Sequence, residues 1–159
     1  MSADAGNAAG GLYRAELLEH SRHPVGAAKL GRDAPGIVRK VNPACGDEVR
    51  LRLVRGPEGR IVAVEHETRG CAVCVASASM LAAEVAARGV AGGMSDAEAL
   101  AREKTVLDRL KSGGLAADDG ALQALNGLAR FPARLACARL AWETFAEAAT
   151  PPPPPALDI

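Results

Sequence analysis

Aromatic residues are scarce in this chain of 159 residues, which has one Trp, one Tyr and two Phe. A core with so few large rings has to be built from alanine, leucine and valine, and it buries little apolar area per residue. A metal ion held only by the folded chain would add to the stability of such a core. The length is typical of one domain with a single core.

The chain also lacks an excess of either charge and a long apolar run. Nineteen basic residues balance nineteen acidic ones, so no net field draws the protein onto a phosphate backbone or an anionic membrane surface. No uninterrupted apolar run reaches the roughly 18 residues that cross a bilayer, and the first residues lack the basic start and apolar core of an export signal. We therefore expect a cytoplasmic protein whose partners include neither nucleic acid nor a membrane.

Four cysteines are present, at positions 45, 71, 74 and 137. In a reducing cytoplasm, cysteines are more often metal ligands, reactive thiols or core residues than members of disulfides. Their role has to be inferred from their positions in the predicted elements.

The first half of the chain has the patterns of a small antiparallel sheet. Apolar and charged residues alternate over 48–53, which predicts a strand with one buried face. The turn sequence at 56–59 and the apolar run at 61–64 predict its hairpin partner. Residues 37–41 are suited to a third strand.

Helical patterns precede and follow these strands. A short helix is predicted to end near residue 22, before Pro24, and an alanine-rich helix over 72–88 is predicted to stop at Gly89. Two further helices are expected over 95–110 and over 133–147. Strands followed by helices indicate an α+β fold in which helices cover one face of a three-stranded antiparallel sheet.

Three short segments carry the residues suited to chemistry. Cys45 and Asp47 flank a glycine in the loop before the clearest strand, where a thiolate and a carboxylate can reach one ion. Cys71 stands at the start of the alanine-rich helix, whose positive dipole end favours a thiolate. Cys137 lies in the last helix. Taken singly, each of these cysteines also suits a turn or a packed core position.

Together, the three segments resemble the signature motifs of SufU/IscU-type proteins, which are similar to the N-terminal domain of NifU and act in iron–sulfur cluster assembly. The resemblance covers residues 12–146 and includes Leu12, Tyr13 and His20. The matching segments are Asn42-Pro43-Ala44-Cys45-Gly46-Asp47, then Gly70-Cys71-Ala72-Val73 with Ala76-Ser77-Ala78-Ser79-Met80, and Arg134-Leu135-Ala136-Cys137-Ala138 with Leu140-Ala141-Trp142.

The resemblance implies a two-layer SufE/NifU-like fold with one metal site at its edge. It assigns four ligands to that site: Cys45, Asp47, Cys71 and Cys137. It also implies a domain over residues 12–148, between an N-terminal tail of residues 1–11 and a proline-rich C-terminal tail of residues 149–159.

Details of the last motif favour the SufU-type subgroup. IscU-type members commonly have a histidine before the last cysteine and a Leu-Pro-Pro-Val-Lys motif, whereas this chain has Ala136 and lacks that motif. Residues 111–128 resemble the SufU-type insertion, and Arg134 occupies the arginine position of that subgroup. The resemblance implies a zinc-dependent sulfurtransferase that binds one zinc ion and accepts persulfide sulfur on Cys45. Its partners would be a SufS-type cysteine desulfurase and other SUF assembly components.

Two other functions stay open at this stage. The same ligands suit a scaffold on which an iron–sulfur cluster is assembled and passed to apo-proteins. Cys71 and Cys74 have the spacing of a thiol oxidoreductase pair, although we interpret Cys74 as a core residue. If Cys74 is not a core residue, it could replace Asp47 as the fourth ligand. Arg134 is either an auxiliary residue that pairs with Asp47 or a partner, or a solvated helix residue.

Overall fold

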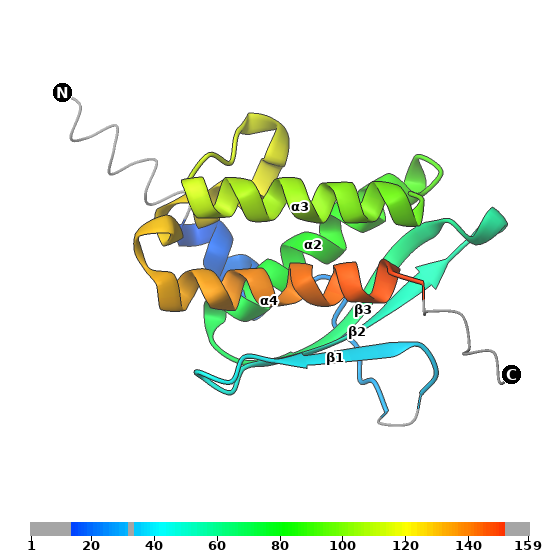
Figure 1. The fold of residues 1–159 in the computed structure, drawn as a ribbon, viewed down its shortest axis with the longest axis horizontal. Coiled ribbons are helices and arrows are strands. Elements are labelled where there is room, and N and C mark those ends of the chain that lie inside the picture. The colour runs from blue at the N-terminus through cyan, green and yellow to red at the C-terminus, as the bar shows by residue number, and fades with distance from the viewer. Residues whose placement is uncertain (1–13, 32–33, 152–159) are drawn as a thin grey trace, which may run out of the picture.

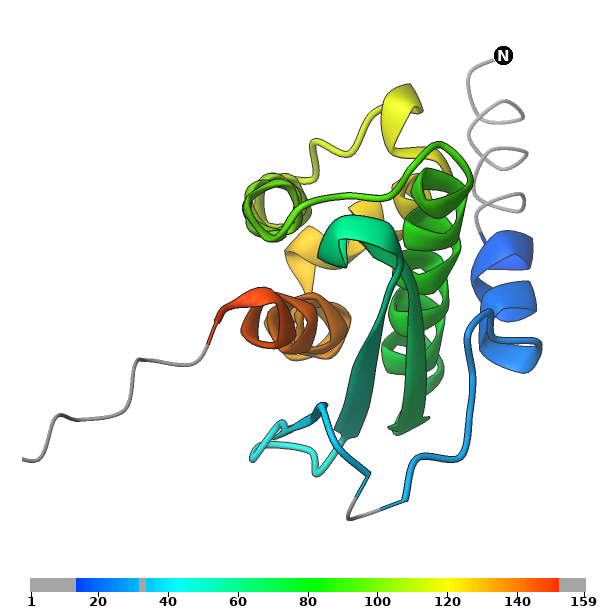
Figure 2. The ribbon, with the colours of Figure 1, turned by 90° about the vertical axis from the view of Figure 1, so that its right-hand side faces the viewer.

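The computed structural model describes residues 14–31 and 34–151. The predicted tail at residues 1–11, most of the proline-rich end and the matching residues Leu12 and Tyr13 lie outside these ranges. Within them, the chain forms one sheet with helices on one of its faces (Figure 1). Residues 14–22 are helical, as predicted, and lie alongside the outer side of α2 (Figure 2).

The sheet has three antiparallel strands in the order β1, β2, β3. These strands are β1 (Ile37–Val41), β2 (Glu48–Arg55) and β3 (Ile61–Arg69). Val49 and Leu51 of β2 face the helices and are fully buried, whereas the charged residues between them lie on the opposite face. The predicted α+β class and the three-stranded antiparallel sheet are confirmed.

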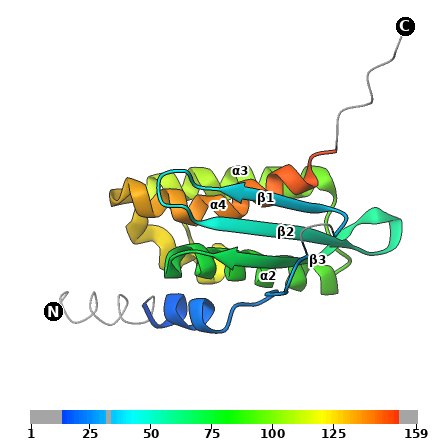
Figure 3. The same ribbon diagram turned by 90° about the horizontal axis from the view of Figure 1, so that it is seen from below.

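Two long helices cover the apolar face of the sheet, and a third packs on one of them. α2 (Ala72–Val90) packs on β3, α4 (Pro132–Ala149) packs on β1 and β2, and α3 (Asp96–Ser112) packs on α4 (Figure 3). Between α3 and α4, the segment η2 (Ala117–Arg130) forms two short 3₁₀ stretches joined by a kink at Gly120.

The central helix α2 corrects two sequence expectations. Gly89 does not stop it, because the helix continues to Val90 and Ala91 is its C-cap. A Cβ on Gly89 would overlap the carbonyl of Val62, so this glycine permits close packing of α2 on β3. The 19 residues of α2 are also apolar enough, by length and composition, to cross a membrane. Its packing explains this composition, because 56% of its apolar window is buried.

The other predicted helix ends are close to the observed ones. The Ser95 side chain accepts a hydrogen bond of 3.1 Å from the Glu98 main-chain N–H, which caps α3. Gly113, with φ of +73°, ends this helix in the left-handed conformation.

Ion pairs attach the insertion between α3 and α4 to the helical layer. The side chain of Asp119 is fully buried and lies 2.8 Å from the guanidinium groups of both Arg102 and Arg109. It also accepts a hydrogen bond of 2.8 Å from the main-chain N–H of Ala116. Arg102 in turn binds Glu84 of α2 at 2.6 Å. A buried carboxylate with this many donors is fully compensated, and the network holds the segment that leads into α4.

Two of the few aromatic residues lie at the centre of the core. Trp142 and Phe145 of α4 are fully buried, with their rings edge to face and 6.1 Å between centroids. Alanine, leucine and valine make up most of the remaining core, as the composition predicts.

One histidine holds the loop before β1 against the edge of β3. The main chain of His66 bonds to Gly26 and Ala28 at 2.9 and 2.8 Å. Its ring is buried between the Val25 carbonyl and the Thr68 hydroxyl, at 2.8 Å from each. Burial lowers the pKa of His66 below its usual 6.5, although the bond to Val25 opposes this shift. The ring is therefore neutral at neutral pH, with Nε2 donating to Val25 and Nδ1 accepting from Thr68.

We expect His66 to make the fold sensitive to acid. Because its pKa is lower in the folded chain, the unfolded chain binds more protons, and the stabilisation from neutral His66 is lost as pH falls below about 6.5. The free energy of unfolding should fall between pH 7.5 and 5.5, by at most about 1.4 kcal/mol per pH unit from this group. Urea unfolding of metal-free protein measures this slope. His66→Gln should have a shallower slope, and equal slopes would contradict the assignment.

Candidate metal centre

Three structural elements meet at one end of the molecule, where the predicted ligands lie. The loop 42–47 joins β1 to β2, and the first turns of α2 and α4 lie at the same end (Figures 1 and 3). At this end the loop residues 43–46 and the helix residues 72 and 132–134 are exposed to solvent.

The loop 42–47 points one ligand outward and one inward. The N–H of Asn42 bonds to the Asp47 carbonyl at 2.8 Å, and the N–H of Gly46 bonds to the Asn42 carbonyl at 2.7 Å. Gly46 adopts φ of +79°, a conformation that favours glycine. As a result Cys45 is exposed on the loop, whereas Asp47 is turned inward with 8% of its surface accessible.

Asp47 lies against the start of α2. Its Oδ2 atom accepts a hydrogen bond of 3.4 Å from the N–H of Cys71, the N-cap residue of α2. Asp47 also fills the space beside Gly70, because a Cβ at that position would lie 2.6 Å from the Asp47 Cγ atom. Sequence reasoning missed this role of Gly70. The signal was the small residue that directly precedes Cys71.

The structure brings three of the four predicted ligands together. One ligand atom each from Cys45, Asp47 and Cys137 lies within 4.8 Å of the other two. Two sulfurs bound to one zinc ion are roughly 3.8 Å apart, given zinc–sulfur bonds of about 2.3 Å and tetrahedral angles. Two thiols and one carboxylate are ligands that zinc accepts, so a small contraction of this group would suit such an ion.

Cys71 is outside that group of three but close to it. Burial, followed by interaction with the side chains of Cys71 and Asp47, raises the pKa of the Cys137 thiol. Cys71 is half-buried, and a change of its side-chain rotamer alters the distance between its sulfur and the sulfur of Cys137.

Cys74 has the environment of a core residue. It is fully buried, and burial, followed by the charge of Asp47, raises the pKa of its thiol to about 12. Such a thiol is a weak nucleophile at neutral pH, which disfavours an oxidoreductase that uses Cys71 and Cys74. All four cysteines are free thiols in the structure.

The remaining candidates occupy supporting or exposed positions. Arg134 is exposed in the first turn of α4 and makes no ion pair with Asp47 or any other residue in 14–31 and 34–151. His20 packs on α2, with Nδ1 at 2.7 Å from the hydroxyl of Ser79. The same hydroxyl accepts a hydrogen bond from the N–H of Val25 at 2.8 Å, so Ser79 anchors both segments.

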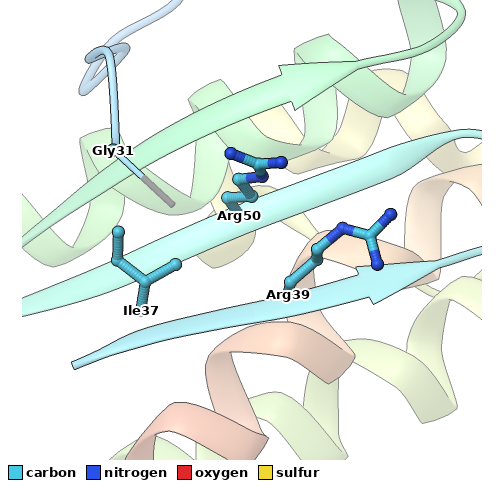
Figure 4. A pocket seen from close by; sticks show the side chains of 4 residues that line it. All are labelled: Gly31, Ile37, Arg39 and Arg50. Atoms are coloured by element: carbon cyan, nitrogen blue, oxygen red, sulfur yellow. The ribbon is translucent and has the colours of Figure 1, made fainter. Parts of the chain in front are cut away.

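A separate cavity of about 340 Å³ lies on the open face of the sheet, lined by Gly31, Ile37, Arg39 and Arg50 (Figure 4). Its two arginines both bind Glu48, at 2.7 and 3.0 Å. Their charges are already partly compensated, and none of the predicted ligands lines this cavity.

Comparisons with known proteins agree with the family resemblance of the sequence motifs. The family model of the NifU-like N-terminal domain matches residues 12–150. The zinc-dependent sulfurtransferase SufU of Bacillus subtilis strain 168 is 33% identical over 139 residues, which cover 84% of this chain and 86% of that protein. The iron–sulfur cluster assembly scaffold protein IscU of Streptococcus pyogenes serotype M1 is 32% identical over 139 residues, or 86% of this chain and 82% of that protein.

Solved structures share the fold. A crystal structure of a protein described only as hypothetical superposes with a TM-score of 0.72 at 31% identity, covering 87% of this chain and 97% of the other. A NifU-like N-terminal protein from Brucella abortus has a TM-score of 0.67 at 19% identity, covering 84% and 88%.

We expect Gly70→Ala to weaken metal binding. The added Cβ would push the Asp47 carboxylate away from Cys45 and Cys137, since it would lie 2.6 to 2.9 Å from three atoms of that side chain. Loss of such a supporting contact typically lowers metal affinity by about 10 to 100-fold. Competition with a chromogenic chelator measures the zinc affinity. Gly127→Ala is the matched control, because no atom lies within 4 Å of its Cβ position. Equal affinities for both variants would contradict this role.

Proposed function

The chain belongs to the NifU-like N-terminal domain family, and on this basis we propose that it acts in iron–sulfur cluster assembly by accepting persulfide sulfur. In this proposal it binds one zinc ion through Cys45, Asp47, Cys71 and Cys137. Its sulfur donor is a cysteine desulfurase of the SufS type. The relative from Bacillus subtilis, whose name states a zinc-dependent sulfurtransferase, supports this choice.

The observation that carries the proposal is the unequal exposure of the two clustered cysteines. Cys45 is exposed on a loop, whereas Cys137 is buried in α4. A sulfur acceptor has to reach a sulfur atom on another protein, so it must be the exposed member of the site. Cys45 meets that requirement, and the left-handed Gly46 beside it gives the loop a conformation in which the thiol points outward.

The transfer itself is a thiol exchange. The Cys45 thiolate attacks the terminal sulfur of the desulfurase persulfide, and a new sulfur–sulfur bond forms on Cys45. The original sulfur–sulfur bond of the desulfurase breaks, and the electron pair stays on its cysteine as a thiolate. Bound zinc would keep the coordinating cysteines deprotonated. No external oxidant or reductant is needed.

Other residues of the chain hold this arrangement in place. The N–H of Cys71 and the close main chain of Gly70 orient the Asp47 carboxylate toward the cysteines. Arg134 is exposed about one turn before Cys137, so its guanidinium is available to an anionic group of the partner. We therefore assign Arg134 to the partner rather than to Asp47.

An assembly scaffold is the second candidate. The similarity to IscU of Streptococcus pyogenes supports it, and thiolates and a carboxylate in one group also suit a cluster. A scaffold would pass its cluster to apo-proteins. The absence of a histidine before Cys137 and the insertion before α4 favour sulfur transfer over this alternative.

We expect Cys45→Ala to abolish stimulation of a SufS-type desulfurase. The measurement is desulfurase turnover with increasing amounts of intact protein or variant, with zinc content determined for each. Cys74→Ala is the control, because Cys74 is fully buried and should be able to lose its sulfur without loss of stimulation. Stimulation that survives in Cys45→Ala would reject the acceptor role. No stimulation by zinc-loaded protein, together with a light-absorbing cluster after anaerobic reconstitution, would favour the scaffold.

A further inference from the structure

The metal centre is surrounded by exposed residues from three segments. These segments are 43–46 in the loop before β2, 69–72 at the junction of β3 and α2, and 131–134 at the start of α4. We call them together the site rim. All of their residues are exposed except Cys71, which is half-buried. Each segment contains a proposed ligand or lies within a few residues of one.

The charge of the site rim is of one sign. It contains Arg69 and Arg134 and no acidic residue, although the whole chain has equal numbers of acidic and basic residues. Glu48 lies opposite Arg69 in the sheet but binds Arg39 and Arg50 instead. Among the described residues, neither Arg69 nor Arg134 has an ion-pair partner. Both guanidinium groups are thus available to carboxylates of another molecule.

The site rim also contains an exposed aromatic ring. Phe131 is 58% exposed, whereas Trp142 and Phe145 are fully buried. Its main chain is held at both ends, because its N–H bonds to the Leu128 carbonyl and its carbonyl accepts from Leu135, each at 2.9 Å. Cys137 is six positions further along the chain, about 9 Å along the helix axis. A single exposed apolar residue is ordinary, but the main chain of this one is fixed at the start of the helix that carries Cys137.

We propose that the site rim is the docking surface for the cysteine desulfurase, and that Phe131 is its anchor. This inference rests on the proposed function and names the partner surface of the same site. Phe131 enters an apolar recess on the desulfurase, and Arg69 and Arg134 face carboxylates at the edge of that recess. Buried aromatic residues and arginines at the centre of an interface contribute most to binding in many complexes.

The geometry of sulfur transfer leads to this surface. The two reacting sulfurs have to approach to about 3 to 3.5 Å, so the partner must cover the Cys45 loop. The first turn of α4 lies at the same end of the molecule and is exposed over four consecutive residues. A partner that covers the loop therefore meets Phe131 and Arg134 as well. Their chemistry, one exposed ring with two cations on the same site rim, selects a recess that is apolar inside and acidic at its edge.

The first test compares Phe131→Ala with Val90→Ala. Val90 is a 93% exposed apolar residue at the far end of α2, about 28 Å along the axis from Cys71. We expect Phe131→Ala to raise the Kd for the desulfurase, and the concentration for half-maximal stimulation, at least tenfold. Maximal stimulation and zinc content should not change. Val90→Ala should match the intact protein within twofold. Phe131→Leu keeps an apolar side chain and should raise the Kd by a smaller factor than Phe131→Ala.

The outcomes separate this inference from the function on which it rests. A Kd of Phe131→Ala within twofold of the intact protein would overturn the docking role, even if Cys45→Ala abolishes stimulation. If the intact protein binds the desulfurase without stimulating it and Phe131→Ala weakens that binding, docking stands and sulfur acceptance fails. If the intact protein neither binds nor stimulates, both fail. Equal thermal unfolding of the variants shows that the fold is intact.

The second test uses the salt dependence of binding. Arg69→Gln should lower the association rate several-fold at low salt and make it less sensitive to added salt, because attraction between exposed charges is screened. Arg88→Gln removes the same charge near the far end of α2 and is the matched control. Equal effects of the two substitutions would mean that net charge alone acts, which would reject a local role for Arg69.

Discussion

The burial of the Asp47 carboxylate against the start of α2 is the constraint on which the candidate metal centre depends. The space that it occupies exists only because Gly70 has no side chain, and the Cys71 N–H supplies a donor in that space. A carboxylate buried without a donor or a metal would be costly. Once Asp47 is held there, the loop that begins at Asn42 closes through main-chain bonds to Asp47 and carries Cys45 to the surface. The position of the proposed acceptor thus follows from a contact between two distant segments.

The candidate metal centre also depends on where α4 begins, because α4 carries Cys137. Cys137 reaches the site because α4 crosses the sheet beside α2, with Trp142 and Phe145 packed in the core. The preceding 3₁₀ segment is attached to α3 and α2 by Asp119, Arg102 and Glu84. η2 consists of two short helical stretches joined by a kink at Gly120, where φ is +59°, and this buried network stabilises the segment from one side. The insertion therefore helps to determine where the first turn of α4 is exposed.

The four cysteines of this chain lie in different environments. Cys45 is on an exposed loop, Cys71 begins a helix, Cys137 is buried among charged and thiol neighbours, and Cys74 is enclosed by the core. The proposed sulfur transfer needs buried thiols and an exposed thiol in one site. The buried thiols would retain a metal, and the exposed thiol can meet a partner. The exposed, basic and partly apolar rim around Cys45 is consistent with such a division of roles.

The amino-acid pattern was sufficient to predict the three strands, the main helices and the family, but not the helical segment η2. Period-2 alternation, turn residues, the Ser95 cap and three ordered cysteine motifs are local signals, and each corresponds to an element or loop of the structure. Tertiary structure decided what local patterns cannot encode. Gly89 was predicted to end α2 but instead allows it to pack on Val62, because close approach between elements depends on their relative placement. For the same reason only the fold could bring Cys45, Asp47 and Cys137 within 4.8 Å and leave Arg134 without Asp47 as its partner.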